Sequence, residues 1–311
     1  MVITANTIVL AHKQIDFISD RLAPRFRVLR DWDDLSHSQA ETVQAIVVAG
    51  DIKLEKDMVA RYRNAGLIAC LTSGYDGVDV AWAKARGLEV SHAVNVNHED
   101  VADHAVGLLI GWVRGLVTGD ALVRTGEWDG KHKVVTRSLR EVSVGIVGMG
   151  ASGRAIASRC VGLGLPVRWW GPRSKSDVIY PRSTDLISLA RDSNVLIIAS
   201  SANDSNRHMI SDVVLDALGP EGLLINVARG SLIDEDALIA QLRRGGIAGA
   251  ALDVFAQEPT PPERWRDLPN VILTPHSAGA TRAVLPKMID QLVRNLDAFF
   301  SGGRLVTPVA A

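Results

Sequence analysis

The chain has 311 residues, which is long enough for two domains, because single hydrophobic cores usually stop growing at about 250–300 residues. Its 34 basic and 35 acidic residues leave a formal charge of −1, so no overall field attracts nucleic acid or an anionic membrane. We therefore expect a small-molecule partner. The first residues lack a signal-peptide pattern and no apolar run reaches membrane-spanning length, so we expect a soluble, cytoplasmic protein.

Short apolar runs bounded by glycine, proline or asparagine recur along the chain, with longer amphipathic stretches between them. This pattern is typical of βαβ units around a buried parallel sheet and predicts an α/β fold. The predicted strands lie within residues 7–10, 45–50, 67–71, 143–150, 167–170, 194–200, 223–228, 247–254 and 271–275. The two cysteines, Cys70 and Cys160, have no second thiol or histidine at ligand spacing, so we expect buried thiols and no metal site.

Two long helices are expected beside the domain boundaries. One covers residues 97–119, where Asn97 can cap the first turn, and the other covers 281–300. We expect a discontinuous substrate-binding domain of residues 1–96 and 283–311 and a dinucleotide-binding domain of residues 97–282. The active site would lie in the cleft between them.

A glycine-rich turn follows the apolar run that begins at residue 143, and a helical stretch follows the turn. Glycine allows the backbone to approach a pyrophosphate closely, and amides at the helix N-terminus meet its negative charge. A dinucleotide is therefore predicted to bind at this turn. Its predicted binding residues are Gly148, Gly150, Ala151, Ser152 and Gly153.

The residues after the next strand indicate which dinucleotide is bound. An NAD site usually has an acidic residue about 20 positions after the turn, where it holds the ribose 2′-hydroxyl. Here the string is Arg173, Ser174 and Lys175, and the nearest following acid is Asp177. These side chains suit a 2′-phosphate, so NADP(H) is favoured and NAD(H) is the alternative.

Three strings in the last third of the chain supply the chemistry for reducing a 2-keto acid: NVARG with Arg229, FAQEP with Glu258 and TPHSAG with His276. An arginine binds the carboxylate and polarises the carbonyl. A histidine, with an ordinary pKa of about 6.5, donates the proton, and a neighbouring carboxylate favours the protonated ring. Arg229 and His276 are thus predicted to contact substrate, with Glu258 as the partner of His276.

The chain resembles the D-2-hydroxyacid dehydrogenase family across nearly its full length. Several independent motifs occur in the family's order, which makes the resemblance specific. The matching strings are SGYDGVD (73–79), NHEDVADHAVGLL (97–109), GIVGMGASGRAIA (145–157), NVARGSLIDEDAL (226–238), GAALDVFAQEP (249–259) and LTPHSAGAT (273–281). The resemblance implies a Rossmann-type doubly wound parallel sheet and a second, smaller flavodoxin-like α/β domain.

The resemblance also implies roles for individual residues. Arg229 would be the substrate-binding and electrostatic residue, His276 the acid/base, and Glu258 its hydrogen-bonded partner. Asp253 would contact the nicotinamide end of the cofactor, and backbone amides around residues 73–74 would hold the substrate carboxylate.

Further residues bear on these roles. By the same resemblance, Ser73 and Gly74 are the predicted substrate-binding residues of the loop at 73–74. The family's cofactor loop often reads Cys-Pro or His-Pro and then Thr-Arg, whereas this chain has serines at 200–201 and Asn206 before Arg207. Asn206 is therefore a candidate cofactor contact. Asp103 and His104 are interpreted as polar anchors of a helix, without a catalytic role.

The arginine–serine pair is similar to that of NADPH-preferring glyoxylate/hydroxypyruvate reductases and of hydroxyphenylpyruvate reductases. We expect NADPH-dependent reduction of glyoxylate or hydroxypyruvate. Arylpyruvates and 2-ketogluconate are alternative substrates, and a dinucleotide-sensing corepressor of the same fold is an alternative of another class. Leu116 and Val117 add apolar surface to the helix expected over 97–119, a region through which related enzymes dimerise, so we expect a homodimer.

Overall fold

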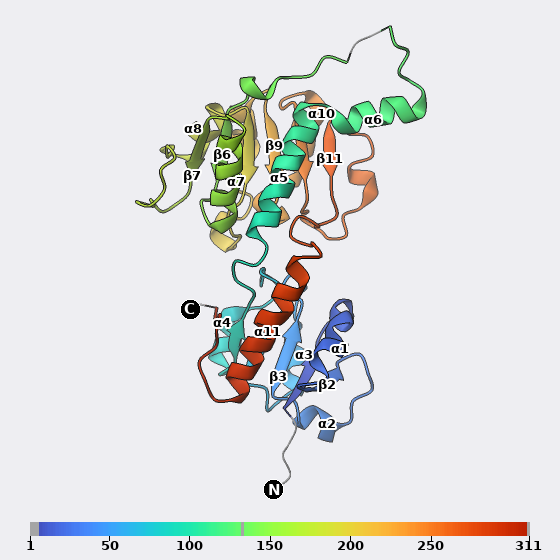
Figure 1. Ribbon diagram of the computed structural model, residues 1–311, viewed down its shortest axis with the longest axis vertical. Helices are drawn as coiled ribbons and strands as arrows, with labels where there is room; N and C mark the ends of the chain where they lie inside the picture. The colour runs from blue at the N-terminus through green and yellow to red at the C-terminus, as the bar shows by residue number, and fades with distance from the viewer. Residues whose placement is uncertain (1–5, 132–133, 310–311) are drawn as a thin grey trace. The chain divides into compact units, whose positions relative to one another are not determined.

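The computed structural model describes residues 6–131 and 134–309 (Figure 1). The chain divides into two compact units, Met1–Asn97 with Arg282–Ala311 and His98–Thr281. The chain therefore passes from one unit to the other at residues 97/98 and 281/282, against 96/97 and 282/283 in the prediction from sequence. Each unit contains its own parallel sheet, so the predicted α/β fold with two parallel-sheet domains is confirmed.

The first unit is built on a five-stranded parallel sheet in the order β2-β1-β3-β4-β5. This is the strand order of flavodoxin-like doubly wound sheets. Its strands are β1 (Thr7–Leu10), β2 (Arg27–Arg30), β3 (Ala45–Val48), β4 (Leu67–Cys70) and β5 (Glu89–Ser91). The two strands that the sequence did not predict, β2 and β5, are the edges, where charged residues replace a continuous apolar run.

The helices of the first unit cover both faces of its sheet. They are η1 (Lys13–Ile18), α1 (Ser19–Leu22), α2 (His37–Glu41), α3 (Lys56–Arg61), α4 (Val80–Ala85) and α11 (Val284–Phe300). In β1, Ile8 and Leu10 belong to one core with Leu296 of α11, whereas Val9 belongs to a second core on the other face. Burial on both faces explains the uninterrupted apolar strands.

The second unit is built on a six-stranded parallel sheet in the order β11-β10-β9-β8-β6-β7. Its strands are β6 (Val144–Val147), β7 (Val167–Trp170), β8 (Val195–Ile198), β9 (Leu223–Asn226), β10 (Gly249–Leu252) and β11 (Val271–Leu273). The chain moves from β6 to β7 on one side and then to β8 on the other. The sheet therefore has a topological switch point at the carboxyl end of β6, where doubly wound sheets bind ligands.

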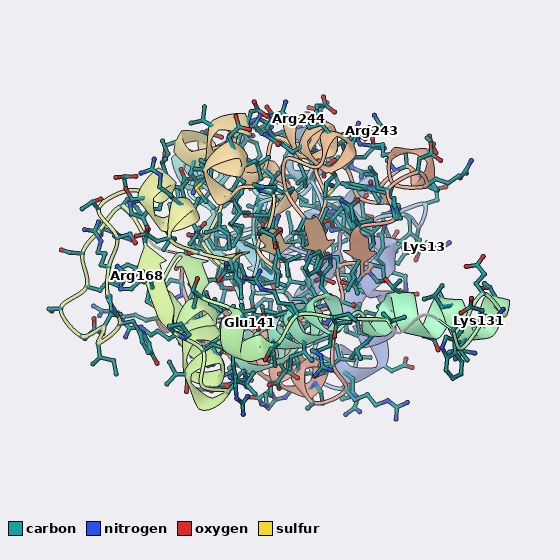
Figure 2. The ribbon with its side chains drawn as sticks, turned by 90° about the horizontal axis from the view of Figure 1, so that it is seen from above. Lys13, Lys131, Glu141, Arg168, Arg243 and Arg244 are labelled. Atoms are coloured by element: carbon teal, nitrogen blue, oxygen red, sulfur yellow. The ribbon has the colours of Figure 1, made fainter. Side chains whose placement is uncertain are left out.

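Helices also cover both faces of the second sheet. The longer ones are α5 (His98–Val113), α7 (Ala151–Gly162), α8 (Leu186–Arg191), α9 (Asp212–Leu218) and α10 (Glu235–Arg244), joined by the short turns η2 (Leu139–Glu141), η3 (Asp204–Asn206), η4 (Gly230–Leu232) and η5 (Pro262–Arg264). Residues of α5 and α7 share one core, and residues of α8, α9 and α10 share the other. Arg243 and Arg244 end α10 and are exposed (Figure 2).

The helix predicted over residues 97–119 is two helices, which corrects that expectation. α5 ends at Val113, Gly115 has a left-handed φ of 58°, and α6 (Leu116–Thr125) continues at an angle of 57° (Figure 1). Glycine adopts this conformation without a steric penalty, and the apolar spacing continues across the bend. Within the described ranges no single helix is long and apolar enough to cross a membrane, although α5 and α6 together meet that criterion by length and composition.

Both cysteines are buried free thiols, as the sequence predicted. Burial raises the pKa of the Cys70 thiol and of the Cys160 thiol to about 12. Each thiol therefore stays protonated near neutral pH and packs as a small apolar side chain.

Candidate active site

The glycine-rich turn lies at the carboxyl end of β6. Gly148 has a φ of 93°, and a Cβ there would lie 2.6 Å from the Cα of Ser200. A Cβ at Gly153 would lie 2.1 Å from the carbonyl oxygen of Gly148. Around Gly150, in contrast, a Cβ would meet no protein atom within 4 Å. The turn is therefore closed against the protein on one side and open at Gly150.

The open side of this turn fits a dinucleotide. Gly150 is the N-cap of α7 and makes no side-chain capping bond, so the first-turn amides, including those of Ala151 and Ser152, are suited to an anion. The hydroxyl of Ser200 is buried and has no hydrogen-bond partner among the residues that the structure describes. A buried orphan donor beside an uncapped helix start is what a pyrophosphate would satisfy.

The loop after β7 holds the residues predicted to choose between NADP(H) and NAD(H). Arg173 and Ser174 are exposed, and Lys175 donates to the carbonyl oxygen of Met149 at 2.9 Å. Asp177 forms an ion pair with Arg154 of α7 at 2.8 Å. The hydrogen bond from Arg154 holds the pKa of Asp177 below its ordinary value. The negative charge of Asp177, the nearest acidic residue after Lys175, is thus compensated by the guanidinium of Arg154.

Asn206 has a structural use that the sequence did not reveal. Its amide nitrogen donates to the carbonyl oxygen of Ser201 at 2.9 Å, and its side-chain oxygen accepts from the amide of Asn203 at 2.8 Å. Both ends of the side chain therefore close the loop that follows β8. A cofactor contact from Asn206 stays a prediction.

Arg229 follows β9, and two residues that the sequence interpretation missed, Asn226 and Gly230, fix the conformation of its backbone. Asn226 is fully buried; its side chain donates to the carbonyl oxygen of Arg229 at 2.9 Å and accepts from the amide of Ala228 at 3.0 Å. A Cβ at Gly230 would lie 1.9 Å from the carbonyl carbon of Phe255. The absence of a side chain at Gly230 therefore allows the turn that contains Arg229 to pack directly against the backbone of the loop after β10. The NVARG string contained both signals, a buried amide and a glycine.

Glu258 and His276 are in direct contact, as the sequence predicted. Nδ1 of His276 lies 2.6 Å from Oε2 of Glu258, and Oε1 of Glu258 accepts from the amide of Phe255 at 2.9 Å. Burial would by itself raise the pKa of Glu258, but these hydrogen bonds and the charges of His276 and Arg229 lower it below its ordinary value. The structure thus brings Arg229, Glu258 and His276 to one place in the second unit. About one third of each side chain of the pair is exposed, which leaves it accessible to a small ligand.

Asp253 lies beneath this cluster, and its side chain is 1% exposed. Both carboxylate oxygens accept hydrogen bonds from residues 274–278, the segment that contains His276. The contact with a nicotinamide that the family resemblance implies stays a prediction. What the structure shows is a buried acid around which the His276 loop is folded.

Ser73 and Gly74, the predicted carboxylate-binding residues, lie in the first unit at the carboxyl end of β4. Thr72 Oγ1 donates to the carbonyl oxygen of Gly74 at 2.9 Å, and Ser73 Oγ donates to Oδ1 of Asn97 at 3.2 Å. A ring nitrogen of His92 lies 2.9 Å from the carbonyl oxygen of Ser73. The loop therefore has a defined backbone conformation of its own.

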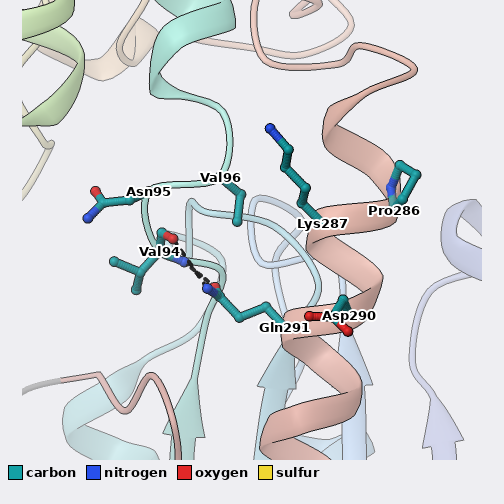
Figure 3. A pocket seen from close by; sticks show the side chains of 7 residues that line it. All are labelled: Val94, Asn95, Val96, Pro286, Lys287, Asp290 and Gln291. Carbon is teal, nitrogen blue, oxygen red and sulfur yellow. Dashed lines mark hydrogen bonds between the residues drawn. The ribbon is translucent and has the colours of Figure 1, made fainter.

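A cavity of about 460 Å³ lies elsewhere in the first unit, beside the start of α11 (Figure 3). Gln291 spans it to the backbone of Val94, accepting from the amide at 2.5 Å and donating to the carbonyl at 3.3 Å. None of the predicted site residues lines this cavity; its lining is Val94, Asn95, Val96, Pro286, Lys287, Asp290 and Gln291. Within the described ranges, no group of three His, Cys, Asp or Glu side chains is placed to hold a metal ion.

Comparisons with known proteins agree with this arrangement. Residues 106–278 match the family model of the D-isomer specific 2-hydroxyacid dehydrogenase, NAD binding domain. The chain is 35% identical over 298 residues to glyoxylate/hydroxypyruvate reductase A of Arabidopsis thaliana, covering 94% of this chain and 95% of the relative. It is 36% identical over 270 residues to 2-ketogluconate reductase of Gluconobacter oxydans, covering 87% of each.

A solved structure extends the likeness to the whole fold. The NADPH-dependent glyoxylate/hydroxypyruvate reductase of Sinorhizobium meliloti, crystallised with NADP and malonate, superposes with a TM-score of 0.92 at 36% identity and covers 98% of this chain and 97% of its own. Motifs, fold, site geometry and these matches lead to one assignment. The chain belongs to the D-isomer specific 2-hydroxyacid dehydrogenase family and is an NAD(P)-dependent oxidoreductase of that family.

Proposed function

We propose that the protein reduces a small 2-keto acid, glyoxylate or hydroxypyruvate, to the D-2-hydroxy acid with NADPH. The observation that carries the proposal is the 2.6 Å contact between His276 and Glu258, beside Arg229, in the unit that contains the glycine-rich turn. Relatives named as glyoxylate/hydroxypyruvate reductases support the substrate class.

Each of the three side chains has a separate task in this proposal. Arg229 binds the substrate carboxylate and stabilises negative charge on the carbonyl oxygen through its fork of donors. Glu258 holds Nδ1 of His276 and favours the imidazolium, so Nε2 is the nitrogen that protonates the developing alkoxide. Bound NADPH supplies the hydride to the carbonyl carbon. In the reverse direction His276 accepts the hydroxyl proton.

The two units divide the remaining work. We assign substrate binding to the first unit, where the amides around Ser73 and Gly74 hold the carboxylate. We assign dinucleotide binding to the second unit. There Gly148, Gly150 and Gly153 admit the pyrophosphate, and Asp253 contacts the nicotinamide end.

The preference for NADPH is assigned to the loop after β7. Arg173, Ser174 and Lys175 provide two cations and a hydroxyl for a 2′-phosphate, and Asp177 is compensated by Arg154. Lys175 already lies over the glycine-rich turn, where it donates to Met149. The Sinorhizobium meliloti reductase, described as NADPH-dependent, supports this preference.

A second candidate substrate is 2-ketogluconate. The Gluconobacter oxydans relative is a 2-ketogluconate reductase, and its identity with this chain is close to that of the Arabidopsis thaliana relative. The chemistry at the carbonyl carbon would be the same, and the two candidates differ in the pocket for the rest of the substrate. A sugar acid demands hydrogen-bonding groups there, which glyoxylate does not.

Initial rates measured over a panel of keto acids test the proposal. Glyoxylate, hydroxypyruvate, phenylpyruvate and 2-ketogluconate are each assayed with NADPH and with NADH. We expect the highest kcat/KM for glyoxylate or hydroxypyruvate with NADPH. Binding of NADPH without turnover of any 2-keto acid would favour a dinucleotide-sensing corepressor, and equal or better use of NADH throughout would contradict the role of Arg173 and Lys175.

We also propose that the protein is a homodimer in which α6 contacts a second copy. No residue of α6 is buried, and Leu116, Val117 and Val123 are 58%, 55% and 61% exposed. Such a run of apolar surface on one helix is typical of a subunit interface. Light scattering at micromolar concentration should show about twice 33.4 kDa, and a mass of one chain would contradict the dimer.

The free, buried thiols support a cytoplasmic location.

A further inference from the structure

The backbone of His276 has an unusual conformation. Its φ is 50°, in the left-handed region that favours glycine, and among the described non-glycine residues it shares this region with Asn95 and His208 alone. The amide of His276 donates to the carbonyl oxygens of Asp253 at 2.8 Å and of Thr274 at 3.1 Å. The direction of the imidazole therefore depends on how residues 253 and 274 are held.

The carboxylate of Asp253 holds both sides of this turn. Its Oδ1 accepts from the hydroxyl of Thr274 at 2.5 Å and from the amide of Ser277 at 2.9 Å, and its Oδ2 accepts from the amide of Ala278 at 2.9 Å. All three groups donate, as an ionised carboxylate requires. Because the Asp253 side chain is 1% exposed, water has little access to the carboxylate oxygens that accept these bonds. The turn 274–278 is thus folded around one buried charge.

His104 reaches this charge from α5. Its Nε2 lies 3.0 Å from Oγ1 of Thr274 and 3.5 Å from Oδ1 of Asp253. A hydroxyl has one proton, and Thr274 gives it to Asp253, so Thr274 accepts from His104 and Nε2 of His104 carries a proton. The adjacent Asp103 instead pairs with Arg159 of α7 at 2.6 Å. Asp103 therefore anchors one helix to another, whereas His104 contacts the His276 turn.

We propose that His104 is a positioning residue for the reaction. It donates to Thr274, which donates to Asp253, and the carboxylate in turn binds the amides on the far side of His276. This chain of hydrogen bonds keeps His276 in its left-handed conformation and its ring against Glu258. The inference rests on the proposed role of His276, and it assigns Asp253 a supporting task in addition to its predicted contact with nicotinamide.

Paired substitutions at His104 test the proposal. Leucine fills similar space without a donor, whereas glutamine can place an N–H near the position of Nε2. We expect His104→Leu to lower kcat by about 10- to 100-fold, the scale of a small misplacement of a reacting group. KM for the keto acid and Kd for NADPH should change little, because the loss occurs in the chemical step. His104→Gln should restore most of the lost kcat.

A second pair of substitutions, at Thr274, tests the same chain of hydrogen bonds if His104→Leu does not fold. Thr274→Ser keeps the hydroxyl and Thr274→Val keeps the shape without it. We expect the serine variant to stay near wild type and the valine variant to lose kcat as His104→Leu does. Equal activity of Thr274→Val and wild type would overturn the proposal, and so would His104→Gln being as impaired as His104→Leu.

His276→Asn, assayed in the same experiment, distinguishes the proposed acid/base role of His276 from the proposed positioning role of His104. If it turns over at nearly the wild-type rate, the proposed acid/base role of His276 is wrong. If it is inactive while His104→Leu keeps the wild-type kcat, the role of His276 stands and the positioning role of His104 is refuted. Loss of kcat in both variants with rescue by His104→Gln supports both.

Discussion

Two loops of the second unit are held in different ways. The turn at 274–278 is folded around the carboxylate of Asp253, which accepts three hydrogen bonds and is 1% exposed. The loop at 171–177 is held by an exposed ion pair between Arg154 and Asp177, by a bond from Lys175 to the carbonyl oxygen of Met149 and by a bond from Arg182 to the carbonyl oxygen of Gly171. Buried bonds fix a geometry more firmly than exposed ones, which water and salt weaken. We infer that the geometry of the proposed catalytic residues is preset, whereas the loop proposed to select the cofactor can be altered with little change in the stability of the fold.

The largest effect on activity is expected from substitutions among the proposed catalytic residues, whose geometry we infer to be preset. His276→Ala or Arg229→Ala should lower kcat/KM for the keto acid by about 100-fold or more, the usual scale for an acid/base or oxyanion-stabilising group. Steady-state kinetics measures the loss, and thermal unfolding shows whether the variant is folded. Arg243→Ala, at the exposed end of α10, is the matched control for Arg229→Ala and should keep wild-type kinetics. Near-wild-type turnover in both site variants would remove these residues from the mechanism.

The close approach at Gly230 gives a stability test of the same region. A Cβ at Gly230 would lie 1.9 Å from the backbone of Phe255, so Gly230→Ala should lower the free energy of unfolding by about 1–3 kcal/mol, the usual cost of overpacking. Gly162→Ala is the control, because a Cβ at this residue of α7 meets nothing within 4 Å. Denaturant unfolding measures both. If Gly230→Ala matched its control, the turn after β9 would be less constrained than we infer.

Substitution in the cofactor loop should change specificity and leave the fold intact. Arg173→Ala should lower kcat/KM with NADPH by about 10-fold or more, since a charge-assisted hydrogen bond contributes about 1.5–3 kcal/mol. The value with NADH should stay close to wild type. Arg168→Ala, an exposed arginine on β7 (Figure 2), is the control. Parallel losses with both cofactors would show that Arg173 does not recognise the 2′-phosphate.

The smallest effect concerns the pH dependence of stability. The pKa of Glu258 is lowered in the folded protein, so its contribution is present above the unfolded value of about 4.3 and is lost as the pH falls through the lower folded value. The difference in free energy of unfolding between wild type and Glu258→Gln should therefore shrink below about pH 4. In a His276→Ala background the difference should be smaller at neutral pH, because the carboxylate has lost its hydrogen-bonded partner. A difference that is constant from pH 7 to pH 3 would contradict the ionised pair.

The fold was predictable where burial is continuous. Strands such as β6 and β8 are apolar throughout because helices cover both faces, and the sequence shows them as uninterrupted runs. The edge strands β2 and β5 contain charged residues that interrupt their apolar runs, and they were missed. The bend at Gly115 was also missed, because the helical spacing of apolar residues continues across it and does not record whether the backbone continues straight.

The predicted site residues were identified from motifs, and their contacts come from the fold. Glu258 and His276 were paired by chemistry and the structure places them 2.6 Å apart. Nothing in the local sequence indicated that His104 of α5 contacts Thr274 170 positions later, or that Asn226 fixes the carbonyl of Arg229. Such partners are brought together by sheet order and helix packing, which no short string encodes.

The sequence by itself determined the α/β class, the glycine-rich turn and the residue types of a keto acid reductase, because each depends on local spacing or on the chemistry of single side chains. Only the tertiary structure decided which hydrogen bonds the site residues form, that Asp253 is buried, and that His276 adopts a left-handed backbone conformation. Those features arise where β9, β10 and β11 end side by side. Hydrogen bonds there join residues that are distant in the chain, and burial makes the bonds strong enough to fix the geometry.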